Sequence, residues 1–395
     1  MDITLTSLEM EHSELLKGKI ASEIASHGGW LLFSRYMEMA LYEPEMGYYS
    51  AGAHKLGAGG DFTTAPELSP LFGAAICSSL LPVLESLKEK GLPTQILEFG
   101  AGTGKLASSI LNRLHDLGFS LDRYDIIEIS PDLAQRQEKH IGDLLKELKL
   151  STQCHWLKEL PKNFKGIMLA NEVIDAIPCD VIIYQNGFWY WYGVAFKDGK
   201  FIWKVGLPVK QELLPESLLG GDFSEGYVTE LHAPANAWMH QVAKHLDTGL
   251  FLTFDYGFPE SEYYHPQRLV GTLMAHHRHH AIQDPFYLPG LCDLTTHVEW
   301  SQIAHSALAE NADDVYLTNQ AAYLLDAGIG DIALEIGNPS DPETFLPISN
   351  SLQKLLSEAE MGELFKAFAF SKNLDTLLPG FSLEDLPGLR GRNRL

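Results

Sequence analysis

The chain has 395 residues and a formal net charge of −23, with 45% hydrophobic, 10% aromatic and 21% charged residues. This length allows one large domain plus a second region, and the ordinary composition needs no disulfide or metal to build a core. The acidic charge excludes a phosphate-backbone partner, because nucleic-acid-binding proteins concentrate Lys and Arg, and it is typical either of solubility or of a cationic substrate.

The N-terminal stretch MDITLTSLEMEHSELL is acidic. It lacks the basic start of a secretory signal and the Arg-rich character of a transit peptide. No run of about 18 apolar residues follows, so we expect no membrane span. The four cysteines form no CxxC pair, which fits a reducing compartment and indicates no zinc site. The sequence therefore predicts a cytoplasmic protein.

Apolar residues spaced three and four apart predict helix from residue 7 to about residue 40, and again over residues 71–90. Between them, residues 42–70 are rich in Gly, Pro and Thr and indicate a loop. A loop of this length is usually functional or disordered, and its aromatic residues favour an ordered loop that covers a ligand. We therefore predict an N-terminal helical extension, residues 1–90, that carries a lid loop at about residues 42–70.

Strands and helices alternate from residue 94 onward. Apolar runs predict strands at residues 95–100, 124–130, 166–173 and 250–257, and a last edge strand at residues 361–371. This alternation predicts an α/β fold with a mostly parallel, doubly wound sheet over residues 91–395.

Two insertions interrupt this alternation. Residues 180–228 begin with two turn signals, Asn186-Gly187 and Asp198-Gly199, each flanked by aromatic and β-branched runs, so we predict a β-hairpin or meander there. Residues 258–300 are rich in histidine and indicate a loop. We interpret both insertions as a substrate region.

The turn FGAGTG, residues 99–104, follows a predicted strand and opens a helix. Glycines there let the backbone approach a ligand closely, and helix N-terminal amides can face its polar atoms. A phosphate-binding P-loop would need Gly at Phe99 and Ser or Thr at Leu106. A dinucleotide fingerprint would need Gly at Lys105. Both interpretations fail, which leaves the GxGxG spacing.

Glu128 ends the second predicted strand. A carboxylate at this place can accept hydrogen bonds from both ribose hydroxyls of a nucleoside. The alternative is a surface acid on a loop, but the strand-helix-strand context favours the ligand.

The sequence resembles the MidA-like family of class I S-adenosylmethionine-dependent methyltransferases, which includes the mitochondrial complex I assembly-factor protein arginine methyltransferase and bacterial relatives. The resemblance covers nearly the whole chain and is carried by GYYS (47–50), GDFTTAPELSPLFG (60–73), ILEFGAGTGKL (96–106), ANEVIDAIP (170–178), DYG (255–257), PGLCDLTTHVEW (289–300) and MGELFKAFAF (361–370). The corresponding turn of the family often reads GPGRG. Here Ala101 stands in place of the proline and Thr103 in place of the arginine, and both are compatible with the turn.

The resemblance implies a Rossmann-like class I methyltransferase fold with S-adenosyl-L-methionine as cofactor. The residues that we expect to bind the cofactor are Gly60, Thr64, Pro66, Glu98, Gly100, Ala101, Gly102, Thr103, Gly104, Glu128, Ile129 and Asn171.

Carboxylates are natural partners for the planar, always charged guanidinium of arginine. Glu172 and Asp175 follow the strand at 166–173, and Asp61 lies in the predicted lid loop, so these three acids are the predicted catalytic residues. The alternative is that Asp175 caps the next helix and that Glu172 is a structural acid.

We expect methyl transfer to an arginine of a partner protein, with a respiratory complex subunit as the acceptor that the resemblance suggests. Two alternatives are a small-molecule or other-residue methyltransferase and a non-catalytic assembly factor that binds the cofactor. We expect a homodimer, no nucleic acid and no metal. The cluster HHRHH, residues 276–280, has no Cys or carboxylate at ligand spacing, and a contact with substrate is its alternative role.

Overall fold

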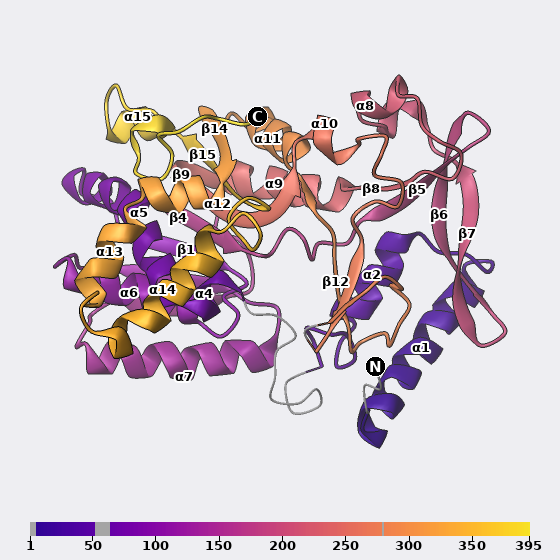
Figure 1. Cartoon of the computed structure of the whole chain (residues 1–395), viewed down its shortest axis with the longest axis horizontal. Coiled ribbons are helices and arrows are strands. Elements are labelled where there is room, and N and C mark those ends of the chain that lie inside the picture. Colours follow the sequence, from indigo (N-terminus) through magenta and orange to yellow (C-terminus); the bar gives the residue numbers. More distant parts are fainter. Residues whose placement is uncertain (1–4, 52–63, 279) are drawn as a thin grey trace. The chain divides into compact units, whose positions relative to one another are not determined.

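The structure is a computed structural model that describes residues 5–51, 64–278 and 280–395. The chain forms two compact units, each assembled from separate stretches of sequence (Figure 1). Unit 1 comprises Met1–Phe62, Ile174–Ala237 and Phe258–Glu299, and unit 2 comprises Thr63–Val173, Trp238–Gly257 and Trp300–Leu395. Both predicted insertions fall within unit 1. Residues 5–51 of the predicted N-terminal extension belong to unit 1, and residues 64–90 belong to unit 2.

Unit 2 is built on a sheet whose strands run in the order β14-β15-β9-β4-β1-β2-β3. Their bounds are β1 (Gln95–Phe99), β2 (Arg123–Ile127), β3 (Gln153–Leu157), β4 (Phe164–Asn171), β9 (Leu246–Phe258), β14 (Asp314–Asn319) and β15 (Phe365–Lys372). The neighbours from β9 to β3 are parallel, whereas β15 is antiparallel to both β9 and β14. The predicted α/β class with a mostly parallel sheet is confirmed.

Two details of the predicted strands were wrong. The stretch at 361–371 was expected at an edge, but β15 lies between β9 and β14, and β14 is the edge strand. The strand expected at 166–173 ends at Asn171, because Glu172 adopts a left-handed φ of 51° that leaves the extended conformation.

Helices cover both faces of this sheet. On one face, Leu250 and Leu252 of β9 share a buried cluster with residues of α5 (Pro70–Glu89) and α6 (Lys105–Asp116). On the other, Phe251 contacts Trp238 of α9 (Ala233–His245) with ring centroids 6.2 Å apart. The remaining helices of this unit are α4 (Ala65–Leu68), α7 (Pro131–Glu147), α11 (Trp300–Ala309), α12 (Gln320–Asp326), α13 (Ile329–Ile336), α14 (Pro342–Leu356) and α15 (Leu374–Leu377). The sheet is therefore doubly wound.

Helix α5 has the length and apolar composition of a helix that could cross a membrane. Its side chains pack in the core, and 72% of its apolar window is buried inside the protein. A helix at the centre of a packed domain meets the same criterion, so this feature is weak evidence for a membrane.

The last residues of the chain run beside the edge strand β14. The Asn393 side chain donates to the Val315 carbonyl at 3.0 Å and accepts from the Leu317 amide at 3.1 Å. The Arg394 amide donates to the Leu317 carbonyl at 2.8 Å. These bonds engage backbone groups of an edge that would otherwise face water or another strand.

Unit 1 contains a sheet in the order β7-β6-β5-β8, with bounds β5 (Asp180–Gln185), β6 (Phe188–Lys197), β7 (Lys200–Pro208) and β8 (Val228–Leu231). Asn186, Gly187, Asp198 and Gly199 all have positive φ, as tight hairpin turns with matching twist require. The predicted meander is confirmed.

The other elements of unit 1 surround this sheet. The expected N-terminal helix is two helices, α1 (Ser7–Ser26) and α2 (Phe33–Tyr42), separated by Gly28 and Gly29 at positive φ. The histidine-rich insertion, expected as a loop, contains a small sheet in the order β11-β10-β12, with β10 (Met274–His277), β11 (His280–Ile282) and β12 (Asp293–Thr295). Short elements complete the unit, namely α8 (Glu216–Leu219), α10 (Glu260–Tyr263) and β13 (Val298–Glu299).

Candidate functional site

The glycine turn lies between the end of β1 and the start of α6. Gly100, Gly102 and Gly104 have φ of 58°, 54° and 85°, a conformation that side chains with a Cβ adopt only with strain. The Gly100 amide donates to the Ile127 carbonyl at 2.9 Å, which extends the β1–β2 pairing into the turn. This geometry explains the GxGxG spacing, since all three glycine positions are left-handed.

The turn lies where the strand order reverses. β1 is flanked by β2 on one side and by β4 on the other, and β1, β2 and β4 run parallel. In doubly wound sheets, ligands bind in the crevice outside the carboxyl ends of the strands at such a switch point. The three stretches that follow β1, β2 and β4 are therefore the candidate site within unit 2.

Glu128 follows β2 directly and is half-buried. Its carboxylate accepts hydrogen bonds from the Ser130 amide at 2.9 Å and from Gln137 Nε2 at 2.8 Å. Burial raises the pKa of this carboxyl, and the hydrogen bonds from Ser130, Gln137 and the Ile129 amide partly offset the rise. The Ile129 side chain is 61% exposed.

Glu98 lies inside the sheet, with 2% of its surface exposed. Its Oε2 accepts a hydrogen bond of 2.7 Å from the Tyr124 hydroxyl. Burial raises the pKa of Glu98 to about 7; the Tyr124 hydrogen bond lowers it, and the charge of Glu128 raises it further.

The stretch after β4 presents an amide and a carboxylate. The Asn171 Nδ2 group donates to Glu172 Oε1 at 3.2 Å, and the Glu172 amide donates to the Phe254 carbonyl at 2.8 Å. The Oδ1 atom of Asn171 is shielded from solvent and has no hydrogen-bond partner among the described residues. An unsatisfied buried acceptor and a non-glycine residue at φ 51° both cost free energy, and such features cluster at functional sites.

Asp175 belongs to unit 1 and is 5% exposed. Its carbonyl accepts a hydrogen bond of 3.0 Å from the Thr296 amide, which ties the segment after β4 to the end of β12. The neighbouring Ala176 carbonyl accepts from the Tyr42 hydroxyl at 2.8 Å. Asp175 is therefore a buried acid in a well-anchored loop.

The described part of the GDFTTAPE stretch meets the glycine turn. Thr64 occupies the N-cap position of α4 and Pro66 its first turn. Glu67 accepts a hydrogen bond from the Thr103 hydroxyl and forms an ion pair of 2.5 Å with Lys105. Two predicted site residues, Gly60 and Asp61, lie outside the described residues.

Of the HHRHH cluster, His276, His277 and His280 lie on the small sheet of unit 1, and His279 lies outside the described residues. His277 is buried, and its Nδ1 lies 2.8 Å from the Leu291 carbonyl. Arg278 forms an ion pair of 2.6 Å with Glu9 of α1. Over the described parts of the chain, no three His, Cys, Asp or Glu side chains are grouped so that they could hold a metal ion.

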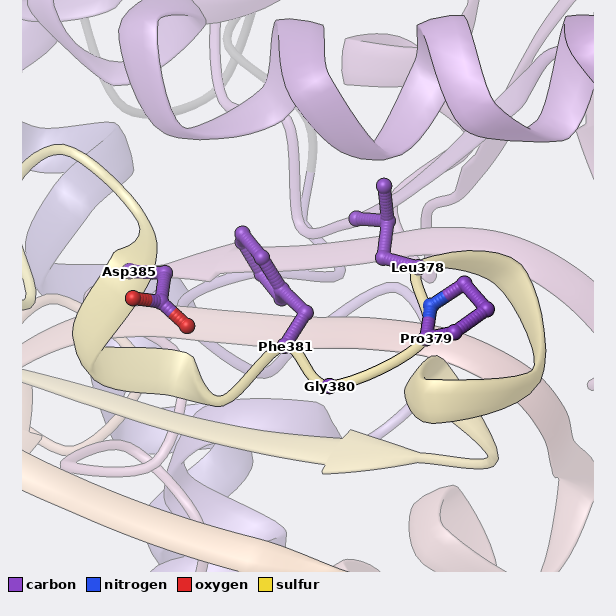
Figure 2. Close-up of a pocket in the computed structure, with 5 residues that line it drawn as sticks. All are labelled: Leu378, Pro379, Gly380, Phe381 and Asp385. Carbon is purple, nitrogen blue, oxygen red and sulfur yellow. The ribbon is translucent and has the colours of Figure 1, made fainter.

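A surface depression of about 430 Å³ lies on the loop between α15 and residue 385 (Figure 2). It is lined by Leu378, Pro379, Gly380, Phe381 and Asp385, and the Leu378 and Phe381 side chains point to the same side of the loop. This loop follows β15, whose last residue pairs with Gly249 near the start of β9. The depression therefore lies toward the amino ends of the parallel strands, whereas the glycine turn lies at their carboxyl ends.

Sequence patterns did not single out Gln137, which is fully buried on α7 and hydrogen-bonds both the glycine turn and Glu128. A signal was present: Leu133, Gln137 and Ile141 are spaced four apart, so a polar amide interrupts the apolar face of an amphipathic helix. The contacts of Glu67 with the turn were also missed.

The fold and these groups define a class. The sheet is doubly wound, a glycine turn follows β1, a hydrogen-bonded acid follows β2, and polar groups follow β4. This is the arrangement of an enzyme that binds a nucleoside-containing cofactor.

Comparison with known proteins identifies the family. Residues 75–317 match the family described as "Putative S-adenosyl-L-methionine-dependent methyltransferase". A Burkholderia thailandensis protein solved with bound S-adenosyl-homocysteine is 45% identical, with a TM-score of 0.88 over 94% of this chain and 95% of that one.

Curated relatives are more distant. The mitochondrial protein arginine methyltransferase NDUFAF7 of Danio rerio is 28% identical over 89% of this chain and 85% of its own length, and that of Homo sapiens is 26% identical over 86% and 80%. The chain belongs to the S-adenosylmethionine-dependent methyltransferase family that residues 75–317 match, as the sequence resemblance predicted.

Proposed function

We propose that this methyltransferase modifies a guanidinium nitrogen of arginine in a partner protein. The observation that carries the proposal is Glu172, a carboxylate held in a left-handed conformation at the carboxyl end of β4, the strand next to β1 and its glycine turn. Two further observations support it: curated relatives are named protein arginine methyltransferases, and a net charge of −23 favours a cationic acceptor.

The residues after β1, β2 and β4 fit the cofactor. The left-handed glycines leave the turn without side chains, so a ligand can approach its backbone. The Glu128 carboxylate can accept from ribose hydroxyls, and the orphaned Asn171 Oδ1 can accept from the ammonium of the methionine moiety. When bound, S-adenosylmethionine supplies a methyl group on a sulfonium, which leaves as a neutral thioether.

Glu172 would orient the acceptor. A carboxylate can bind a guanidinium through two parallel hydrogen bonds, which would hold one nitrogen in line with the methyl group. The nitrogen–carbon bond then forms as the sulfur–carbon bond breaks, and the nitrogen releases one proton, which Glu172 can accept and pass to water. Asp175 and Asp61 stay predictions from the sequence, and Asp61 lies outside the described residues.

The finer parts of the proposal are a respiratory complex subunit as acceptor, a homodimeric assembly and a cytoplasmic location. The first rests on the family resemblance alone. The curated relatives are named as mitochondrial, so cell fractionation is the direct test of location. Size-exclusion chromatography with light scattering tests the assembly.

The test of the acceptor uses a cell lysate, purified protein and S-adenosylmethionine with a labelled methyl group. We expect a labelled protein band in which mass spectrometry finds methylarginine. Label on another residue type or on a small molecule would refute the arginine proposal. Cofactor binding without any labelled product would favour the non-catalytic assembly factor.

The test of Glu172 is the variant Glu172→Gln with Glu89→Gln, an exposed acid at the end of α5, as the matched control. We expect Glu172→Gln to lower methylation about 100-fold or more, because an acid that orients or deprotonates the nucleophile contributes at least this much. Its affinity for S-adenosylhomocysteine, measured by calorimetry, should stay within about twofold of the wild-type value. Unchanged methylation would show that Glu172 has no part in the reaction.

A further inference from the structure

A buried amide on α7 joins the two halves of the candidate cofactor site. Gln137 is 0% exposed, and its Nε2 donates to the Gly102 carbonyl and to Glu128 Oε2, both at 2.8 Å. Its Oε1 accepts from Trp156 Nε1, also at 2.8 Å. All the hydrogen-bonding groups of this side chain therefore have partners.

The partners fix which way the amide points. The Trp156 indole N–H can only donate, whereas the Gly102 carbonyl and the ionised Glu128 carboxylate can only accept. A flipped amide would place two donors together on one side and an oxygen against two acceptors on the other. Of the uncharged side chains of this length, only glutamine offers two donors and one acceptor at the end of its stem.

We infer that Gln137 is a positioning residue for the cofactor: it sets the spacing between the glycine turn after β1 and the nucleoside-binding acid after β2. The inference rests on the proposed cofactor site. Gly102 and Glu128 lie in separate loops, and neither loop alone determines how far apart the two ligand-binding groups stand. The amide bridges them through two bonds from one nitrogen.

Helix α7 provides the rigid support for this bridge. A Cβ built on Gly104 would lie 3.6 Å from His140 and Ile141 of the same helix, so the helix also packs against the end of the turn. The Glu128 carboxylate holds the Ser130 amide, at the N-cap of α7. Gln137 thus belongs to a connected group of contacts that links the glycine turn, Glu128 and helix α7.

The bridge also acts on the charge of Glu128. Burial raises the pKa of this carboxyl, and the N–H groups of Ser130, Gln137 and Ile129 lower it. From β1, the titratable Glu98 faces it, and each of the two carboxyls raises the free energy of ionising the other. Loss of the Gln137 donor raises the Glu128 pKa further, so a cofactor that needs the ionised acid should bind less well as the pH falls.

The test measures S-adenosylhomocysteine binding by titration calorimetry, without any acceptor. Gln137→Met keeps the length and apolar stem but removes every hydrogen bond, and Gln135→Met is the matched control because Gln135 is exposed on the same helix. We expect Gln137→Met to weaken binding about tenfold near pH 8 and more near pH 6, because a charge-assisted bond is lost and the acid protonates earlier. Gln135→Met should stay within about twofold of the wild type.

Steady-state kinetics with the acceptor supplies a second readout. A positioning role predicts a raised KM for S-adenosylmethionine with kcat nearly unchanged at saturation, whereas general loss of structure would lower the amount of active enzyme and hence kcat. Wild-type affinity and an unchanged pH profile in folded Gln137→Met would overturn the inference.

A second variant covers the case in which Gln137→Met does not fold. Trp156→Phe keeps an aromatic ring but removes the N–H that fixes the amide, so we expect a smaller loss of affinity, about threefold. Unchanged binding by Trp156→Phe would then overturn the inference. Wild-type protein that binds S-adenosylhomocysteine but modifies no arginine would refute the proposed acceptor and leave the role of Gln137 standing.

Discussion

Replacing Glu98 by glutamine should stabilise the ligand-free protein at alkaline pH. The Glu98 carboxyl is buried beneath the glycine turn, and its hydrogen bond comes from the neutral Tyr124 hydroxyl. Burial raises its pKa from 4.5 to about 7, so the folded protein holds this proton more tightly than the unfolded chain does. The glutamine amide that replaces the carboxyl carries no charge and keeps an oxygen that can accept from Tyr124.

The sign and size follow from proton linkage. Below about pH 4.5 both states carry the proton, and Glu98 and its amide analogue should be nearly equivalent. As the pH rises from 4.5 to about 7, the unfolded chain loses the proton first, and the wild type is progressively destabilised. The difference then levels off at about 3 kcal/mol, since each pKa unit corresponds to about 1.4 kcal/mol.

Unfolding midpoints of wild type and Glu98→Gln, measured from about pH 4.5 to 8.5, test this reasoning. We expect the two curves to coincide at the acid end and to separate toward alkaline pH, with the variant more stable. Tyr124→Phe should act in the opposite direction at alkaline pH, because the charged carboxylate loses its donor. A difference between wild type and Glu98→Gln that does not vary with pH would refute the buried-acid interpretation.

Three further predictions concern the turn and the sheet edge. Gly102→Ala should lower the free energy of unfolding by about 1–2 kcal/mol in denaturant titrations, since φ is 54° and no atom lies within 4 Å of the new Cβ; no change would contradict a strained turn. Glu67→Gln should cost less than about 1 kcal/mol, and high salt should remove the difference in thermal melting, because its partner Lys105 is 48% exposed; a larger, salt-independent loss would point to another role. Asn393→Ala should cost about 1 kcal/mol and increase light scattering on storage, because β14 loses two hydrogen bonds; equal scattering would argue against edge protection.

Local patterns predicted the parts of the fold that local chemistry determines. The buried strands β1, β2, β4 and β9 are apolar runs, and the turns at Asn186-Gly187 and Asp198-Gly199 need residues that tolerate positive φ. The glycine turn was recognised for the same reason. In each case, a few neighbouring residues are enough to specify the conformation.

The order of strands and the division into units are not local properties. β15 was expected at an edge but is paired on both sides, and β3 (QCHWL) and β14 (DVYLTN) lack the continuous apolar run that marks a buried strand. The short strands β10 to β13 of the histidine-rich insertion are two to four residues long, below the length at which alternation is visible.

The candidate site was predictable only as far as its motifs. Glu128 and the turn glycines were found because a ligand constrains their residue types. Gln137 was not, because its role depends on a helix that packs against two loops, and a single polar residue on an apolar face is compatible with many structures. Its partner Trp156 comes from β3, which the sequence did not reveal.

The antiparallel strand β15 also has a consequence for biosynthesis. It spans Phe365–Lys372, near the end of the chain, yet it pairs with β9 on one side and β14 on the other. While the ribosome is still making the preceding residues, both partners have emerged with an unpaired edge, and exposed edges of this kind favour aggregation. The sheet can close only after Lys372 has left the ribosome, so until then β9 and β14 keep unpaired edges of the kind that chaperones cover.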